Sequence, residues 1–133
     1  AILKKKTIKI GNLNSIRDFL YVEDLCSAFE KVYKSKKLYG EIVNVGSNSE
    51  ISIKNLISKI SKILKIKLKT SVEKKRIRPK NSEVKRLKCD NSKLKRLTNW
   101  RAKYNFQDGI KEVISWMGKD NNIKNFKPGN YNI

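Results

Sequence analysis

The sequence predicts a mixed α/β fold, and three observations support this prediction. Short segments rich in β-branched residues alternate with longer segments in which apolar residues recur every three or four positions. Glycines, a proline and helix-capping residues separate the two kinds of segment. The 133 residues are 38% hydrophobic and 33% charged, so the chain could form one small domain with a modest core or part of a larger protein.

The first third of the chain predicts a strand, a helix and a second strand. Residues 7–12, TIKIGN, alternate apolar and polar side chains and end in a Gly-Asn turn. From Val22 to about Ser35, apolar residues recur with helical spacing, which predicts a helix that turns them toward a core. They are Val22, Leu25, Cys26, Phe29, Val32 and Tyr33. The β-branched segment 41–46, EIVNVG, predicts a short buried strand.

The middle of the chain predicts a helix, a strand and a loop. Ser52 is a suitable N-cap for a helix over residues 53–64, in which isoleucines and leucines form one stripe and the lysines face water. Residues 66–73, IKLKTSVE, alternate as a strand. Residues 76–84 are predicted to form a loop, because Pro79 disfavours helix at the residue before it.

The last third predicts a short extended segment and two helices. Residues 86–90, RLKCD, form the extended segment. Asp90 or Asn91 caps a short helix over residues 92–97, and residues 107–117 form the final helix. Its inward side chains are predicted to be Ile110, Val113, Ile114 and Met117, with Trp116 at the edge.

The charge of the chain is strongly positive, with 32 Lys and Arg against 12 Asp and Glu. A net charge of +20 favours a polyanionic partner such as nucleic acid, an acidic membrane surface or a nucleotide, without choosing among them. Genome composition explains the excess equally well, because the lysines occur together with many isoleucines and asparagines.

Several classes of site are excluded or disfavoured by composition. The sequence has no histidine, and Cys26 and Cys89 lie far apart, so we expect no metal site, no disulfide and no Ser-His or Cys-His nucleophile. No segment approaches the roughly 18 to 20 apolar residues of a membrane span. We therefore expect a soluble cytoplasmic protein that does not bind membranes.

One short motif has the spacing of a catalytic pair. Tyr33 and Lys37 match Tyr-x-x-x-Lys, in which a lysine lowers the pKa of a tyrosine for proton transfer. With five tyrosines, and Lys or Arg at 32 of 133 positions, about one such match is expected by chance. We interpret the pair as a core tyrosine and a surface lysine. Gly40 and Gly46 are too far apart for a G-x-G-x-x-G phosphate loop.

Two arginines occur next to residues that fix the backbone. Arg17 precedes Asp18 at the approach to a helix, and Arg78 precedes Pro79 in a rigid loop. If folding brings them together, they could clamp a diphosphate through forked, charge-assisted hydrogen bonds. Glu83 could accept hydrogen bonds from a ribose diol. In the alternative interpretation, Arg17 and Asp18 form a local ion pair and Glu83 balances nearby lysines, contributions of about 0 to 1 kcal/mol each.

Five sequence elements, in order, resemble the C-terminal part of the extended short-chain dehydrogenase/reductase family, the NAD-dependent epimerases and dehydratases. They are G-N-L-N-x-x-R-D-F-x-Y-V-x-D, G-x-x-x-N-V-G, a lysine-rich S-I-x-x-L-I helix, R-x-R-P-x-x-S-E-V-x-x-L-x-x-D-x-S-K followed by a tryptophan, and G-I-x-x-x-I-x-W. The GNL-RD and RP-SEV elements look most like GDP-mannose 4,6-dehydratase and related nucleotide-sugar 4,6-dehydratases.

The resemblance implies roles for individual residues. Arg17 and Arg78 would contact the substrate diphosphate, Asn12 would lie near the nucleotide, and Glu83 would bind its ribose. By the same analogy, an aspartate begins a helix packed on the dinucleotide-binding sheet, two residues belong to a strand at the edge of that sheet, and three are structural. These are Asp24, then Asn44 and Gly46, then Asp90, Lys93 and Trp100.

The resemblance also implies an organisation. Residues 1–117 would form the C-terminal substrate-binding portion with edge elements of a Rossmann-type parallel sheet, and residues 118–133 a polar tail. In the family, the N-terminal half holds the NAD(P) loop, the catalytic Tyr-x-x-x-Lys and the acidic pair that eliminates water. We identify none of these in the sequence, so this half is predicted to be absent.

The activity expected from the resemblance is therefore incomplete. The family reaction oxidises sugar C4 with NAD(P), removes water across C5 and C6, and returns hydride to C6. We expect no catalytic or cofactor-binding residues in this chain, no NAD(P) binding by the chain alone, and little catalysis without the missing half. Complete members are usually homo-oligomers. The alternatives are a nucleotide-sugar 4-epimerase of the same family, a remnant of a broken gene, or a basic nucleic-acid-binding module, which no alternation of basic and aromatic residues favours.

Overall fold

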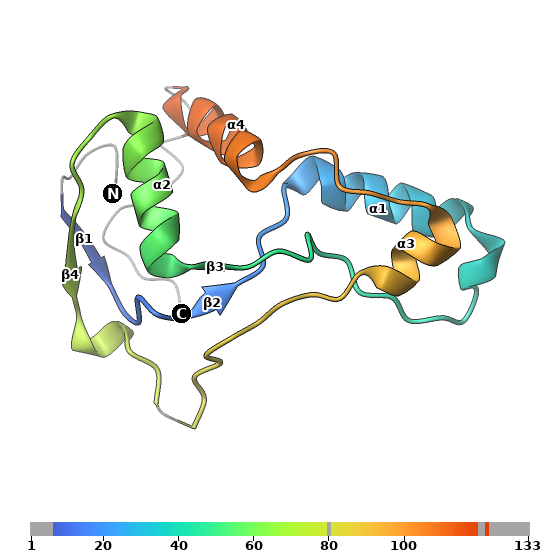
Figure 1. Ribbon diagram of the computed structural model, residues 1–133, viewed down its shortest axis with the longest axis horizontal. Helices are drawn as coiled ribbons and strands as arrows, with labels where there is room; N and C mark the ends of the chain where they lie inside the picture. Colours follow the sequence, from blue (N-terminus) through green and yellow to red (C-terminus); the bar gives the residue numbers. More distant parts are fainter. Residues whose placement is uncertain (1–6, 80, 120–121, 123–133) are drawn as a thin grey trace.

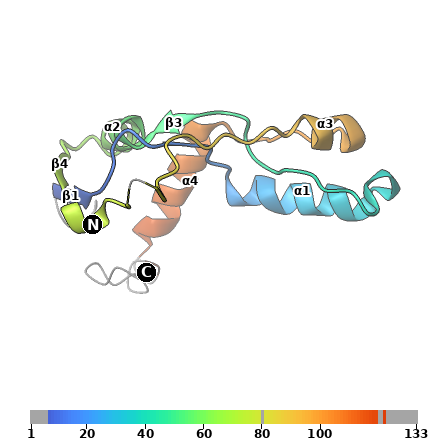
Figure 2. The ribbon, with the colours of Figure 1, turned by 90° about the horizontal axis from the view of Figure 1, so that it is seen from below.

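The computed structural model describes residues 7–79, 81–119 and 122. They form an elongated molecule with a mixed β and α end and an all-helical end, as Figures 1 and 2 show from two directions. The first end contains β1 (Thr7–Ile10), β4 (Lys69–Val72), η2 (Lys74–Arg76), α2 (Ile53–Leu64) and α4 (Phe106–Gly118). The second contains α1 (Val22–Lys34), η1 (Lys36–Leu38) and α3 (Ser92–Thr98). Two short strands, β2 (Ile16–Arg17) and β3 (Ile51–Ser52), lie between the ends.

Two small sheets join segments that are distant in the sequence. β1 and β4 pair in parallel, with Thr7 opposite Lys69, which confirms the strands predicted within residues 7–12 and 66–73. β2 and β3 pair antiparallel. These strands were not predicted, because two residues are too few for an alternating pattern to be visible. The predicted extended segment 86–90 contributes an isolated parallel bridge to β2 and no strand.

The helices begin and end close to the predicted residues. α2 starts after Ser52, whose hydroxyl accepts a hydrogen bond from the Asn55 N–H at 3.2 Å, so the predicted N-cap is confirmed. α3 has Asn91 at its N-cap position, but the side chain that accepts the Ser92 N–H is that of Asp90, at 2.9 Å. α4 begins at Phe106, one residue earlier than predicted.

The main core lies at the α1–α3 end. Ala28, Leu38, Leu94 and Trp100 are buried there, and the indole nitrogen of Trp100 donates to the Ser27 hydroxyl at 2.9 Å. Partly buried side chains surround this cluster: Leu20, Val32, Val43, Val45, Leu97 and Ala102. The core is therefore small, as the composition of the chain predicts.

The predicted inner face of α1 is wrong in part. Phe29 is 60% exposed and Tyr33 is 84% exposed, while the buried residues of the helix are Asp24 and Ala28. Apolar periodicity identifies a helix correctly, but it does not say which apolar residues the neighbouring elements reach. In the described part of the chain, α3 packs on one side of α1, and the edge of α1 that carries the larger side chains is exposed to solvent. Tyr33 is consequently not a core tyrosine.

The predicted strand over residues 41–46 is also wrong for this structure. No strand is formed there, and Ile42 is 85% exposed. Val43 and Val45 pack against the core from the other side of the segment. A β-strand needs a neighbouring strand for its backbone hydrogen bonds, and the described residues place none beside this segment.

The C-terminal tail predicted for residues 118–133 falls largely outside the described residues, which include 118, 119 and 122. No helix in the described ranges is long and apolar enough to cross a membrane. The cytoplasmic location stays a prediction.

Candidate functional site

The four residues singled out in the sequence, Asn12, Arg17, Arg78 and Glu83, line one cleft of about 310 Å³. The cleft lies between the segment that joins β1 to β2 and the loop after η2. Its complete lining is Lys9, Ile10, Gly11, Asn12, Ser15, Arg17, Ile53, Arg76, Arg78 and Glu83. Folding therefore brings together side chains that are about 60 to 70 positions apart in the sequence.

Backbone pairing explains why these segments meet. The Ile16 N–H donates to the Lys85 carbonyl at 2.9 Å, and the Leu87 N–H donates to the Ile16 carbonyl at 3.0 Å. This short parallel ladder holds the chain just after Glu83 alongside β2. On the other side, Gly11 approaches the backbone of Arg76 so closely that an added Cβ would lie 2.2 Å from the Arg76 carbonyl oxygen. Any side chain at position 11 would clash with this carbonyl, so the position requires glycine.

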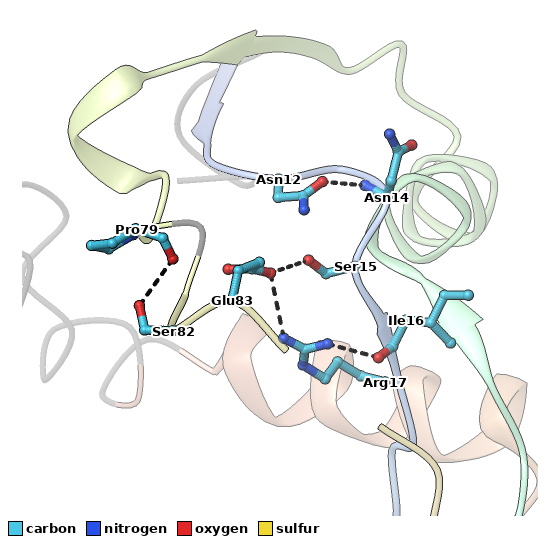
Figure 3. A network of polar contacts seen from close by, with 8 residues as sticks. All are labelled: Asn12, Asn14, Ser15, Ile16, Arg17, Pro79, Ser82 and Glu83. Carbon is cyan, nitrogen blue, oxygen red and sulfur yellow. Dashed lines mark hydrogen bonds and ion pairs between the residues drawn. The ribbon is translucent and has the colours of Figure 1, made fainter. Parts of the chain in front are cut away.

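A three-residue network fixes the interior of the cleft (Figure 3). The Ser15 hydroxyl donates to Glu83 Oε1 at 2.6 Å, and Arg17 Nη2 lies 3.8 Å from the same oxygen. Arg17 Nη1 donates to the carbonyl of Ile16 at 2.7 Å. The contacts of Glu83 with other described residues all involve Oε1, so among these residues Oε2 has no hydrogen-bond partner. The carboxylate thus holds the arginine with one oxygen and leaves the other available.

Asn12 is oriented by its own turn. Its Oδ1 accepts the Asn14 N–H at 2.9 Å, which an amide nitrogen could not do, so this contact fixes the direction of the side-chain amide. The amide nitrogen then points toward the side of the cleft where Ser15 and Glu83 lie (Figure 3). Asn12 consequently presents a hydrogen-bond donor to the cleft.

Arg78 is exposed at the rim of the cleft. Its guanidinium forms no hydrogen bond or ion pair with any other residue that the structure describes. After Pro79, the Ser82 N–H and hydroxyl both donate to the Pro79 carbonyl, at 2.9 and 3.1 Å, and this turn leads the chain back to Glu83. The loop therefore presents Arg78 and Glu83 to the same space.

Asp18 does not pair with Arg17, as the local ion-pair interpretation required. Asp18 does not line the cleft, and its carboxylate accepts the N–H groups of Ser47 (2.9 Å), Asn48 (2.9 Å) and Cys89 (3.2 Å). Burial and the nearby Asp18 carboxylate raise the pKa of the Cys89 thiol, which therefore stays protonated at neutral pH. In this sequence motif the arginine faces the cleft and the aspartate anchors two backbone segments, residues 47–48 and residue 89.

Sequence reasoning missed three polar or charged residues of the cleft: Ser15, Lys9 and Arg76. Arg76 ends η2 and Arg78 follows two residues later, and the R-x-R-P spacing, which puts a second arginine close to Arg78, was a usable signal. Glu73 lies behind them and bonds Arg76 Nε at 2.6 Å, and this bond lowers the pKa of the Glu73 carboxyl. No comparable pattern in the sequence marks Ser15.

The lining is electropositive. It includes four cationic side chains and one carboxylate, which leaves an excess of three positive charges around a small cleft. The N-terminus of α2 adds no anion site, because its first N–H groups are already bonded. Ile53 N–H donates to the Ser15 carbonyl at 3.0 Å, Lys54 N–H to the Leu13 carbonyl at 2.9 Å, and Asn55 N–H to Ser52.

The residues with structural roles by analogy make structural contacts. The buried Asp24 accepts the N–H groups of Lys103 (2.7 Å) and Tyr104 (3.1 Å), which ties α1 to the segment before α4. Lys93 bonds the Glu41 carboxylate at 2.6 Å and the Ile42 carbonyl at 2.9 Å. Gly46, which the analogy assigns to a strand at the sheet edge, accepts at its carbonyl the side-chain amide of the buried Asn91 at 2.7 Å. None of these side chains lines the cleft.

Neither the Tyr-x-x-x-Lys pair nor the glycines form a catalytic pair or an NAD(P) cradle in the described residues. α1 ends at Lys34, so Tyr33 and Lys37 do not share a helix face, and neither lines the cleft. Other parts of the chain fill the space beside Gly11 and Gly46. A Cβ on Gly46 would lie 2.3 Å from the Cβ of Cys89, and a Cβ on Gly11 would lie 2.2 Å from the Arg76 carbonyl oxygen. No group of three or more His, Cys, Asp or Glu within the described ranges could hold a metal ion.

Comparisons with known proteins agree on one family. The family described as GDP-mannose 4,6 dehydratase matches residues 1–113. A putative UDP-glucose 4-epimerase of Methanocaldococcus jannaschii is 34% identical over 115 residues, which are 86% of this chain and 35% of that protein. The dTDP-D-glucose 4,6-dehydratase of Homo sapiens is 33% identical over 116 residues, covering 84% of this chain and 31% of that protein.

Solved structures lead to the same group of folds. A UDP-glucuronic acid 4-epimerase from Bacillus cereus, in complex with UDP-glucuronic acid and NAD, has a TM-score of 0.75 and 26% identity. The match covers 93% of this chain and 37% of that protein. The chain thus spans about a third of the length of the proteins it matches.

Proposed function

Because the chain belongs to the GDP-mannose 4,6-dehydratase family of NAD-dependent epimerases and dehydratases, we propose that its cleft binds the diphosphate and ribose of a sugar nucleotide. In this proposal residues 1–117 are the substrate-binding portion of a nucleotide-sugar 4,6-dehydratase, and residues 118–133 are a tail. The described contacts that support it concern the four cleft residues predicted from the sequence.

The observation that carries the proposal is the shared cleft of Arg17 and Arg78. A diphosphate carries at least two negative charges, and the lining offers an excess of three positive charges. Two guanidinium groups can each donate two parallel hydrogen bonds to phosphate oxygens, which lysine ammonium groups cannot reproduce. Arg17 keeps most of its donors available, because its close hydrogen bond uses Nη1 alone.

The remaining two residues suit the nucleoside. Glu83 Oε2 is an acceptor with no partner among the described residues, and a ribose diol supplies two hydroxyl donors. Asn12 contributes an amide N–H at the other side of the cleft, which suits a phosphate or a carbonyl oxygen. The polar groups of the cleft therefore match both ends of a nucleoside diphosphate.

The reaction type is the less specific part of the proposal. Relatives carry the names of 4,6-dehydratases and of 4-epimerases, so a nucleotide-sugar 4-epimerase is the alternative within the family. In this proposal the cleft residues bind and orient the substrate. We propose that this chain is inactive alone and that the redox and acid-base groups belong to a Rossmann-type N-terminal half.

Exposed apolar surface supports such a partner. Phe29 and Tyr33 on α1, and Ile42 in the unpaired segment 41–46, are more than half exposed. The Ile42 and Gly46 carbonyls accept side-chain hydrogen bonds, but the segment pairs with no strand among the described residues. Such a segment next to an apolar helix edge is the kind of surface that a parallel α/β sheet covers. We propose that the N-terminal half covers it and that the complete protein forms a homo-oligomer.

Titration calorimetry tests the proposal against nucleic-acid binding. The chain should bind GDP-mannose or UDP-glucose saturably at 0.15 M salt, and Arg78→Ala should weaken binding by about tenfold or more, the value of one or two charge-assisted hydrogen bonds. Arg101→Ala removes the same charge from an exposed position outside the cleft and should change affinity by less than about twofold.

Two results would contradict the proposal. One is equal behaviour of the Arg78→Ala and Arg101→Ala proteins toward sugar nucleotides. The other is tight binding of single-stranded oligonucleotides of any sequence that falls steeply with salt, which would favour the basic nucleic-acid-binding module.

A further inference from the structure

We propose that Ser15 is a positioning residue, whose hydroxyl prevents the Glu83 carboxylate from closing onto Arg17 and so keeps the arginine available to a diphosphate. This inference rests on the proposed function of the cleft and assigns a role to a residue that neither the sequence motifs nor the family resemblance singled out.

Ser15 is enclosed but polar. It is 5% exposed, and its hydroxyl donates to Glu83 Oε1 at 2.6 Å, a short bond to a charged acceptor. Its carbonyl accepts the Ile53 N–H at the start of α2, at 3.0 Å. The backbone of Ser15 is therefore held by the start of α2, while its side-chain hydroxyl bonds Glu83.

The distances around Glu83 indicate a restrained ion pair. Arg17 Nη2 lies 3.8 Å from Oε1, which is too long for a hydrogen bond, although both side chains are largely enclosed. An enclosed arginine and carboxylate normally close to a bidentate pair with two bonds of about 2.7 to 2.9 Å. Here Ser15 occupies a lone pair of Oε1 and Ile16 holds Nη1, so the pair stays open.

An open pair favours ligand binding. A diphosphate that approaches the cleft must take hydrogen-bond donors from Arg17, and it does so more readily when no carboxylate already occupies them. Without the Ser15 hydroxyl, Glu83 is free to rotate onto Arg17 and to compete with the phosphate oxygens. The same movement would remove Oε2 from the cleft.

The backbone contact allows the side-chain role to be separated from a scaffold role. Ser15→Ala keeps the carbonyl that caps α2 and removes only the hydroxyl. Ser15→Thr keeps the hydroxyl with one added methyl group. Glu83→Gln removes the charge that competes for Arg17 while retaining an acceptor for Ser15.

The test is a double-mutant cycle with GDP as the probe, read by calorimetry on the full chain. We expect Ser15→Ala to weaken GDP binding by about tenfold, equivalent to one charge-assisted hydrogen bond, and Ser15→Thr to retain most of the affinity. In the Glu83→Gln background, Ser15→Ala should change the affinity by less than about twofold, because no carboxylate is left to close. Melting temperatures of all variants identify any that are unfolded.

The outcomes distinguish the inference from the function it rests on. The positioning role would be overturned if Ser15→Ala bound GDP as tightly as the parent chain. It would also be overturned if Ser15→Ala lost the same GDP affinity with and without the Glu83 carboxylate. In either case, a loss of affinity in Arg78→Ala would still support the proposed function of the cleft. A scaffold role would lower melting temperature and affinity together in both backgrounds. Absence of saturable GDP binding by the parent chain would overturn the proposed function and this inference together.

Discussion

Replacement of Asp18 by asparagine tests the interpretation that the aspartate of the Arg-Asp pair is an anchor. The carboxylate accepts Ser47 at Oδ1 and the N–H groups of Asn48 and Cys89 at Oδ2. Asparagine retains one acceptor oxygen, and its NH₂ group would face N–H donors in place of the other. The substitution therefore removes at least the two bonds at Oδ2, together with the charge.

The expected loss of stability follows from these two bonds. Hydrogen bonds to a charged group contribute about 1.5 to 3 kcal/mol each. Asn48 is exposed, so water replaces part of its bond, whereas Cys89 is half-buried. We expect Asp18→Asn to lower the free energy of unfolding by about 2 to 4 kcal/mol, a large part of the 5 to 15 kcal/mol, roughly, of a typical domain.

Urea denaturation followed by tryptophan fluorescence measures this difference, since Trp100 is buried in the core. Asp90→Asn is the matched control: its carboxylate is exposed and accepts one N–H group, that of Ser92. Aspartate and asparagine cap helices about equally well, so the control should lose less than about 1 kcal/mol. Free energies for the two variants within about 0.5 kcal/mol of each other would refute the anchoring role.

Three further predictions concern packing and pH. Gly46→Ala should lower the free energy of unfolding by about 1 to 3 kcal/mol, because the added Cβ would lie 2.3 Å from the Cβ of Cys89. Gly118→Ala is the control: its added Cβ would meet no facing atom within 4 Å, so the urea midpoint should stay unchanged or rise. Leu94→Ala in the core should lower that free energy by about 2 to 5 kcal/mol, and Phe29→Ala on the exposed edge of α1 by less than about 1 kcal/mol; similar losses would disprove the burial pattern. The Tyr104 hydroxyl donates to the Glu23 carboxylate at 2.8 Å, and this hydrogen bond raises the pKa of the phenol from 10.0 to about 12. The unfolded chain therefore ionises first, and stability should fall as pH rises from about 10 to about 12, less steeply in Tyr104→Phe; a phenolate absorbance titration of Tyr104 near 10 would contradict this.

Local sequence patterns predicted the helices and the longer strands well, because their physical causes are local. Ser52 caps α2 as expected, and the alternating segments became β1 and β4. Patterns in one segment could not predict pairings between distant segments. The two-residue strands β2 and β3 exist because tertiary contacts align them, and the parallel register of β1 with β4 depends on the whole chain between them.

The candidate site shows the same division. Arginine next to aspartate or proline was a sufficient reason to select Arg17 and Arg78, and the structure brings both to one cleft. The partner of each charge could not be read from neighbours in the sequence: Arg17 lies beside Glu83 and not beside Asp18. The exposed edge of α1 was not predicted for a related reason: an apolar pattern indicates that a helix face packs against something, but it does not show which part of the protein packs there.

The distance along the chain between Ser15 and Glu83, 68 residues, has a consequence for the order of events in folding. Contacts that close such long loops form late, after nearby helices have condensed, because the entropy of loop closure opposes them. Helices α1 and α2 can therefore exist in chains whose cleft is still unassembled. A nucleotide that binds there would recognise completed chains alone and would slow their unfolding, so that ligand occupancy would become a measure of the mature fraction.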